Sequence, residues 1–217
     1  MFVGHYAAAI AAKAVEPRAP LWTYALAAQL VDVAWGGLVI AGVERLSLDP
    51  DLPGSALVLE HMPYTHSLPA AVLWSVGAAA AARFLLRLPA VAAGMLGAVV
   101  FSHWLLDLIV HRPDLALWFG GPKVGFALWN HPVPEQALEI GLIAMAAAAW
   151  GWRRGVEGQG WRAPVVFLGF LVALQIVAML LPAEGGAAGM GLSALGAYLA
   201  VTLAAAFADR PRRPQAP

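Results

Sequence analysis

Residues 89–111, PAVAAGMLGAVVFSHWLLDLIVH, decide the fold class because they form a long apolar run with a polar pattern in its second half. A helix rises about 1.5 Å per residue, so this run is long enough to cross ~30 Å of hydrocarbon. His103, Asp107 and His111 follow one another at intervals of four residues. On a helix such positions lie roughly on one face. The stretch therefore predicts a membrane-spanning helix with ionisable groups along one side.

The rest of the chain has the same apolar character. It is 61% hydrophobic and only 12% charged over 217 residues, whereas soluble domains have about 25% charged residues. We predict an all-α, polytopic transmembrane helical bundle with about six spans, preceded by a short half-membrane helix over residues 3–14. The bundle forms a single domain over residues 1–208, and residues 209–217 form a basic tail. The six predicted spans are residues 21–43, 66–84, 89–111, 135–152, 163–182 and 188–208.

Charge indicates how this bundle is oriented. The formal net charge is zero, which gives no indication of nucleic-acid binding. The absence of cysteine excludes disulfides, thiolate metal sites and cysteine nucleophiles. The six predicted spans place ten of the thirteen basic residues on one side of the membrane. By the positive-inside rule that side is the cytoplasm, so the C-terminus is cytoplasmic and the long loops 44–65 and 112–134 are extracytoplasmic. The ten are Lys13, Arg18, Arg83, Arg87, Arg153, Arg154, Arg162, Arg210, Arg212 and Arg213, against Arg45, Arg112 and Lys123.

In this topology the histidines converge on the extracytoplasmic half of the membrane, together with two carboxylates. A charged carboxylate inside a span costs at least ~2.5–3.5 kcal/mol and usually marks function. No Lys or Arg lies in the core of a predicted span to pair with Asp32 or Asp107. Imidazole nitrogen and carboxylate oxygen together suit Zn²⁺, with Mn²⁺ or Fe²⁺ as alternatives. We therefore predict a divalent metal site whose ligands are His5, Asp32, His66, His103 and Asp107.

Each of these residues also has a simpler interpretation. A single histidine such as His5 can be an interhelical hydrogen-bonding partner. His61, His111 and His131 lie near the predicted interface, where an exposed polar side chain costs little. The carboxylates can belong to buried polar pairs that hold no metal. Glu139, one turn into the predicted span 135–152, raises the same question as the aspartates.

Four stretches resemble, in order, the motifs of the YdjM-like membrane-bound metal-dependent hydrolases, and a fifth is similar to a block of an uncharacterised bacterial branch. The resemblance covers roughly residues 1–140. The wider relationship of that family is to zinc-dependent phospholipase C and the P1-type nucleases, which are helical phosphoesterases with several zinc ions. The resemblance implies a metal-ligand role for the five residues named above. The chain departs from the family pattern where Val33 and Ala34 follow Asp32, and where Met62 and Pro63 follow His61. The four stretches are FVGHYAAAIAAK (2–13), AAQLVDVAW (27–35), MPYTHSLPAAVLW (62–74) and SHWLLDLIVHRPDL (102–115). The fifth, which resembles the bacterial branch sometimes labelled a permease, is KVGFALWNHP (123–132).

The leading functional prediction is a metal-dependent hydrolase of the bacterial inner membrane. Its substrate is expected to be a phosphoester or a lipid-derived molecule that reaches the site from the extracytoplasmic side, with membrane lipid as its partner and no nucleic acid. Glu60, Glu139 and His111 are the candidates for a general base or a ligand-orienting group. Two alternatives stay open. One is a transporter or permease with an intramembrane His/Asp metal or proton site, and the other is a structural membrane protein without metal.

Overall fold

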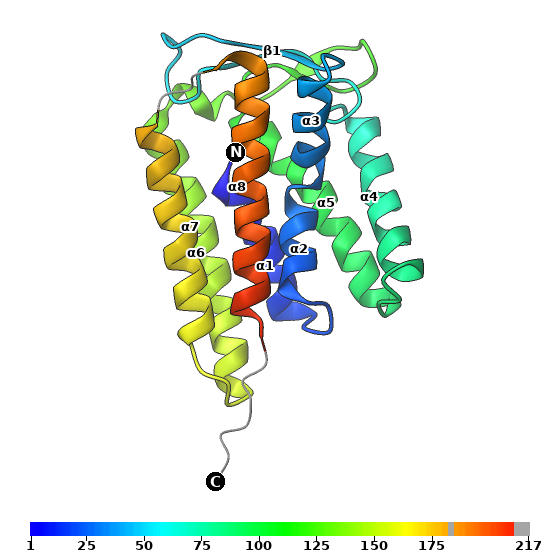
Figure 1. Cartoon of the computed structure of the whole chain (residues 1–217), viewed down its shortest axis with the longest axis vertical. Coiled ribbons are helices and arrows are strands. Elements are labelled where there is room, and N and C mark those ends of the chain that lie inside the picture. The colour runs from blue at the N-terminus through cyan, green and yellow to red at the C-terminus, as the bar shows by residue number, and fades with distance from the viewer. Residues whose placement is uncertain (182–184, 211–217) are drawn as a thin grey trace.

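The computed structural model describes residues 1–181 and 185–210. Most of the predicted tail 209–217, including Arg212 and Arg213, lies outside the described residues. The described part is mostly helical, as predicted, and its helices run up and down in one bundle (Figure 1). Its α-helices are α1 (Tyr6–Val15), α2 (Leu21–Ala28), α3 (Leu30–Ile40), α4 (Leu68–Phe84), α5 (Ala90–Val110), α6 (Pro132–Val156), α7 (Arg162–Leu180) and α8 (Gly186–Ala208).

Local sequence signals set several of the helix starts. Ser67 precedes α4, and its side-chain oxygen accepts a hydrogen bond from the Ala70 backbone N–H at 3.3 Å. This is an N-cap, and a proline in the first turn supports it because proline has no N–H to satisfy there. Pro89 immediately precedes α5, and Pro132 begins α6. These prolines therefore mark helix boundaries.

Fewer helices meet the requirements for a membrane span than the six that were predicted. Three of them, α5, α7 and α8, are long and apolar enough to cross a membrane. The pair α2 and α3 makes up to a fourth, but it bends by 51° at Gln29 within the predicted span 21–43. The prediction of six spans is not supported, because α4 has only 17 residues and α6 carries Glu135, Gln136 and Glu139 near its start.

The N-terminal segment lies at the centre of the bundle. The short 3₁₀ helix η1 (Val3–His5) leads directly into α1, which packs against α6 and α2. The side chains of Tyr6, Ala9 and Ile10 are fully buried. The segment predicted as a half-membrane helix is therefore a core helix that other helices surround (Figure 1).

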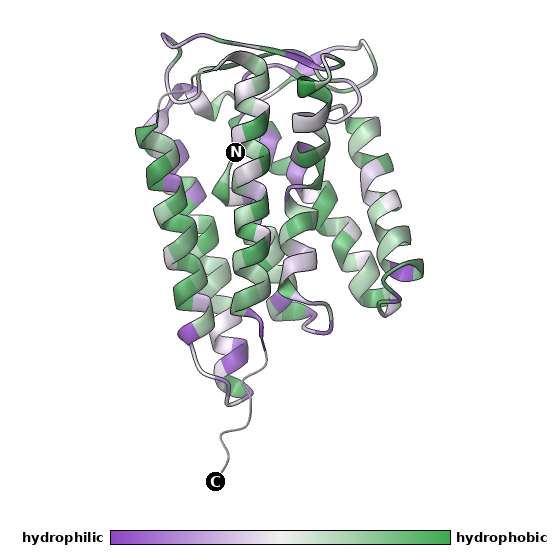
Figure 2. Ribbon diagram, viewed as in Figure 1, coloured by the Kyte–Doolittle hydropathy of each residue, from purple (hydrophilic) through white to green (hydrophobic). Residues whose placement is uncertain are grey.

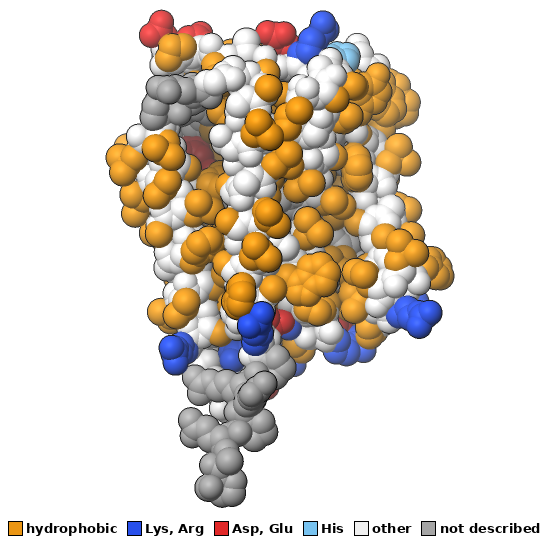
Figure 3. Space-filling view, viewed as in Figure 1, with side chains coloured by type: hydrophobic (Ala, Val, Ile, Leu, Met, Phe, Trp, Pro, Cys, Tyr) orange, Lys and Arg blue, Asp and Glu red, His pale blue; other side chains and the backbone are white. Residues whose placement is uncertain are grey.

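The two ends of the bundle differ in structure and charge. At one end, β1 (Arg45–Leu48) pairs antiparallel with β2 (Leu57–His61), and β3 (Leu115–Ala116) pairs with β4 (Lys123–Val124). We call this the hairpin end, and it lies uppermost in Figure 1. The helix sides between the two ends are mainly apolar (Figure 2). The opposite end gathers lysine and arginine side chains (Figure 3), and we call it the basic end. Its described basic residues are Lys13, Arg18, Arg83, Arg87, Arg153, Arg154, Arg162 and Arg210.

Candidate metal centre

Six ionisable side chains meet in the interior of the bundle, in the half nearer the hairpin end. Each has less than a tenth of its surface exposed. Ligand atoms of His5, His103 and Asp107 lie within 4.8 Å of one another, and so do those of Asp32, His66 and His103. The structure therefore brings together all five predicted metal ligands. We call the six residues the His/Asp cluster: His5, Asp32, His66, His103, Asp107 and His111.

Asp107 on α5 is the hub of the cluster, because its two oxygens face different histidines. Oδ1 lies 3.0 Å from Nε2 of His5 and 3.4 Å from Nε2 of His111. Oδ2 lies 3.1 Å from Nε2 of His103 and 3.6 Å from Nε2 of His66. The four-residue spacing of His103, Asp107 and His111 thus places their functional atoms together, as the helix periodicity predicts.

Asp32 forms the other acidic wall of the cluster. Its Oδ1 lies 3.2 Å from Nε2 of His66 and 3.4 Å from Nε2 of His103. Its Oδ2 accepts a hydrogen bond of 2.8 Å from the Tyr198 hydroxyl on α8. One oxygen is therefore held by the protein while the other faces the imidazoles.

The bend between α2 and α3 positions both Asp32 and His103. The carbonyl oxygen of Ala28, at the last residue of α2, lies 2.8 Å from Nδ1 of His103. A carbonyl oxygen can only accept, so His103 donates through Nδ1–H, and in the neutral imidazole its Nε2 carries the lone pair that faces the cluster. The broken helix thus supplies a backbone acceptor that fixes this tautomer.

A two-step contact fixes the tautomer of His66. The Thr65 hydroxyl donates to the carboxylate of Glu44 at 2.6 Å, and the same oxygen lies 2.7 Å from Nδ1 of His66. A hydroxyl has one proton, which Glu44 receives, so Thr65 must accept from Nδ1–H of His66. The remaining nitrogen, Nε2, therefore presents a lone pair to Asp32 and Asp107.

His111 is oriented in the same way at the end of α5. Its Nδ1 lies 2.8 Å from Oδ1 of Asp114, so Nδ1–H donates to this carboxylate and Nε2 points toward Asp107. Histidines that bind metals are commonly held by such contacts at the other ring nitrogen. Three imidazoles, those of His66, His103 and His111, thus share one tautomer and direct Nε2 into the cluster.

His5 completes the cluster by stacking on His103. Their ring centroids lie 3.8 Å apart with an interplanar angle of 8°. Among the described residues, Nε2 of His5 and Nε2 of His103 have no partner in hydrogen-bonding geometry, although both lie near carboxylate oxygens. Nitrogen and oxygen atoms that bind a shared cation lie close together without hydrogen-bonding geometry. Each lone pair then points at the ion rather than at the neighbouring ligand.

Glu139 holds the N-terminal segment in place. Its carboxylate accepts hydrogen bonds from the backbone N–H of Phe2 at 2.9 and 3.0 Å and of Gly4 at 2.8 Å. These contacts fix the turn that carries His5, and the Met1 amino group lies 3.1 Å from Oδ1 of Asp107. Glu139, one of the predicted catalytic residues, therefore lies near the cluster with the N-terminal segment between them.

The other predicted candidates lie in two different places. His111 is buried in the cluster, 4% exposed. Glu60 lies on the exposed face of β2 at the hairpin end, and the structure does not bring it to the cluster. His61 and His131 are exposed as well, in agreement with the simpler interpretation of those histidines.

The buried carboxylates of the cluster need compensating positive charge or hydrogen bonds. Two carboxylates are buried there, and among residues 1–181 and 185–210 no Lys or Arg side chain pairs with them. The Met1 amino group is the single fixed cation that contacts them within this part of the chain. Buried carboxylates need compensation by charge or hydrogen bonds. A divalent cation bound by Nε2 and carboxylate oxygens would provide it.

Sequence reasoning missed the residues that support the cluster. Thr65 and Asp114 had a local signal, because each lies within three positions of a predicted site histidine. Glu44 and Tyr198 had none, since they lie far from His66 and Asp32 along the chain.

Comparison of the chain with family models, curated proteins and solved structures finds no match. The functional argument therefore rests on the geometry of the His/Asp cluster.

Proposed function

We propose that this protein is a membrane-embedded, metal-dependent hydrolase whose metal is bound by His5, Asp32, His66, His103 and Asp107. One observation carries the proposal. Three buried imidazoles are fixed as Nδ1–H tautomers, so their Nε2 lone pairs face the two buried carboxylates. Lone pairs and carboxylates facing one another repel unless a proton or a metal cation lies between them. The family resemblance of the motifs adds the expectation of hydrolysis.

The donor set favours zinc. Imidazole nitrogens and carboxylate oxygens in a dry, compact site suit Zn²⁺, with Mn²⁺ or Fe²⁺ as alternatives. The two oxygens of Asp107 face different histidines, so this carboxylate would serve as a ligand in a site for one metal or for two. When bound, such an ion polarises a phosphoryl oxygen and lowers the pKa of a coordinated water toward ~7.

Side chains beside the proposed metal ligands have separate roles. His111 lies at the hairpin-end side of the cluster, where Asp114 holds its ring and leaves Nε2 free to take a proton. Glu139 positions His5, because its carboxylate fixes the backbone segment that carries this histidine. We assign Glu60 no part in this reaction, since it lies on the exposed face of β2.

The position of the cluster suggests the substrate and the side of the membrane. Eight described basic residues gather at the basic end against three at the hairpin end, so the positive-inside rule places the hairpin end outside the cytoplasm. The cluster then belongs to the extracytoplasmic half of the bacterial inner membrane. A lipid phosphoester fits this location because it reaches the site from within the bilayer.

A transporter is the second candidate, and the packing argues against it. Between the cluster and the basic end, the described interior is filled by buried apolar side chains such as Ile10, Leu96 and Val100. The interior between the cluster and the basic end is therefore closed in this conformation, which suits a reaction site better than a conduction path.

Elemental analysis of the purified protein tests the proposal. We expect at least one divalent metal per chain, lost in the double variant His103→Ala plus Asp107→Ala. The matched control, His61→Ala plus His131→Ala, removes two exposed histidines and should leave the metal content unchanged. Metal content far below one per chain, unaltered by the double variant, would contradict the metal site. Release of phosphate-containing headgroups from lipid vesicles then tests hydrolysis separately.

A further inference from the structure

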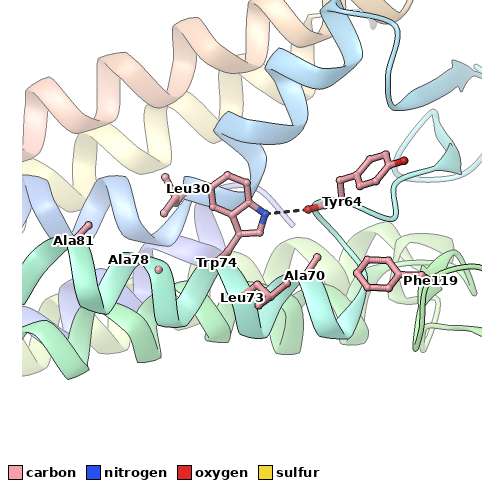
Figure 4. Close-up of a pocket in the computed structure, with 9 residues that line it drawn as sticks. Leu30, Tyr64, Ala70, Leu73, Trp74, Ala78, Ala81 and Phe119 are labelled. Atoms are coloured by element: carbon pink, nitrogen blue, oxygen red, sulfur yellow. Dashed lines mark hydrogen bonds between the residues drawn. The ribbon is translucent and has the colours of Figure 1, made fainter.

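An apolar cavity of about 540 Å³ lies between α4 and the bent pair α2–α3. We call it the α4 groove. One wall is a single face of α4 that includes Trp74, Gly77 and Ala78, and Leu30 at the start of α3 forms the opposite wall (Figure 4). Tyr64 and Phe119 border the end nearer the metal centre.

The groove exists because α4 is packed on one flank only. That flank lies tightly against α5, where a Cβ on Gly97 would come 2.9 Å from the carbonyl oxygen of Ser75. On the other flank α4 makes few contacts with α3. Small side chains, such as Gly77 and Ala78, leave this flank hollow.

The lining of the groove selects for hydrocarbon. Nearly all of its surface is apolar. The indole nitrogen of Trp74 donates to the backbone oxygen of Tyr64 at 3.0 Å, so it is satisfied within the protein (Figure 4). Leu73, on the same helix, has 67% of its surface exposed. A ligand in this groove gains from apolar contact and has no charged group to pair with.

The groove is continuous with the segments that build the metal centre. Tyr64 lies two residues before His66, and Leu30 lies two residues before Asp32. Glu44 accepts from the backbone N–H of Tyr64 at 2.9 Å and from the Thr65 hydroxyl at 2.6 Å. The same carboxylate therefore fixes both the end of the groove and the tautomer of His66.

We propose that the α4 groove holds one hydrocarbon chain of a phospholipid, whose headgroup lies at the hairpin end beside the His/Asp cluster. The proposal names the substrate class of the proposed hydrolase and rests on that function for the role of the headgroup. The groove would set the register of the lipid, since a chain fixed along α4 limits how far the phosphoester can move from the cluster.

Gly77→Leu is the test variant, because Gly77 lines the groove and a Cβ there meets no atom within 4 Å. Gly169→Leu is its matched control. Gly169 lies on the exposed side of α7, and a Cβ there also meets no atom within 4 Å. Both variants add the same apolar side chain to a helix surface, but only one of them fills the groove.

The probe is phosphatidylglycerol with a photoreactive diazirine on one acyl chain, in vesicles that contain the full-length protein. We expect cross-linked residues to concentrate on the groove face of α4, with a several-fold loss in Gly77→Leu and no loss in Gly169→Leu. Cross-links spread equally over α4 and α7, or unchanged by Gly77→Leu, would overturn the proposal. A shift from dimer to monomer in Gly77→Leu without loss of cross-links would overturn it too, because a second copy would then occupy the groove.

This measurement needs neither metal nor turnover, so it separates the two proposals. Specific cross-linking in a protein without metal or phosphodiesterase activity would leave the lipid groove standing and remove the hydrolase. Metal-dependent headgroup release that Gly77→Leu leaves unchanged would support the hydrolase and remove the groove as its lipid site.

Discussion

Glu44 controls the tautomer of His66 without touching it. The Thr65 hydroxyl joins the two, because it donates a hydrogen bond to Glu44 at 2.6 Å and accepts one from Nδ1–H of His66 at 2.7 Å. Glu44 comes from the segment between α3 and β1, whereas His66 directly precedes the N-cap of α4. The segment between α3 and β1 therefore determines which ring nitrogen of His66, a proposed metal ligand, carries the proton.

Thr65→Val tests this connection, because valine has nearly the same shape but no hydroxyl. We expect metal affinity to fall by about 10–100-fold, the usual effect of losing a contact that orients a ligand, as measured by competition with a chromophoric chelator. Thr23→Val is the control, since its hydroxyl bonds to the Pro20 oxygen at the basic end. Equal affinities in the wild type and Thr65→Val would contradict the role of Thr65.

Tyr198→Phe removes the hydroxyl that donates to Oδ2 of Asp32 at 2.8 Å. A hydrogen bond to a charged group contributes about 1.5–3 kcal/mol, so thermal stability and metal affinity should both fall. Tyr24→Phe removes a hydroxyl that donates to the Glu16 backbone oxygen, far from the cluster. It should lower stability without changing metal affinity. A Tyr198→Phe protein that binds metal as well as the wild type would show that Asp32 is not a ligand.

Glu139→Gln tests the anchoring of the N-terminal segment. The amide keeps one acceptor oxygen but turns a donor toward backbone N–H groups, so one of the contacts with Phe2 or Gly4 is lost. We expect unfolding at lower temperature and weaker metal binding through displacement of His5. Glu157→Gln, on the exposed end of the same helix, should change neither quantity. Wild-type stability in Glu139→Gln would leave its buried carboxylate unexplained.

Removal of the metal should destabilise the folded protein. A ligand at 100 times its dissociation constant stabilises the folded state by about 2.7 kcal/mol. We therefore expect a chelator to lower the thermal unfolding midpoint of the wild type in detergent, and added Zn²⁺ to restore it. His103→Ala plus Asp107→Ala should show no response to either reagent. A wild type that is equally insensitive would favour the structural protein without metal.

The sequence predicted the part of the site that follows from helix periodicity. His103 and Asp107 share a face of α5, and the lack of basic partners in the spans pointed to a cation. The bend at Gln29 carries no proline or glycine at the break itself, so the span 21–43 was predicted as continuous. Glu139 accepts hydrogen bonds from Gly4 and Phe2, which precede it by 135 and 137 positions along the chain. No local pattern encodes such distant contacts.

The central place of α1 has a consequence for biosynthesis. Chains are made from the N-terminus, so α1 emerges before every helix that encloses it. Its main partner α6, with the carboxylate that anchors Phe2 and Gly4, emerges more than a hundred residues later. Contacts between segments so distant along the chain form slowly. The first helix, too short to cross the bilayer alone, therefore meets its main packing partner late, and the turn that carries His5 is anchored only when α6 is in place.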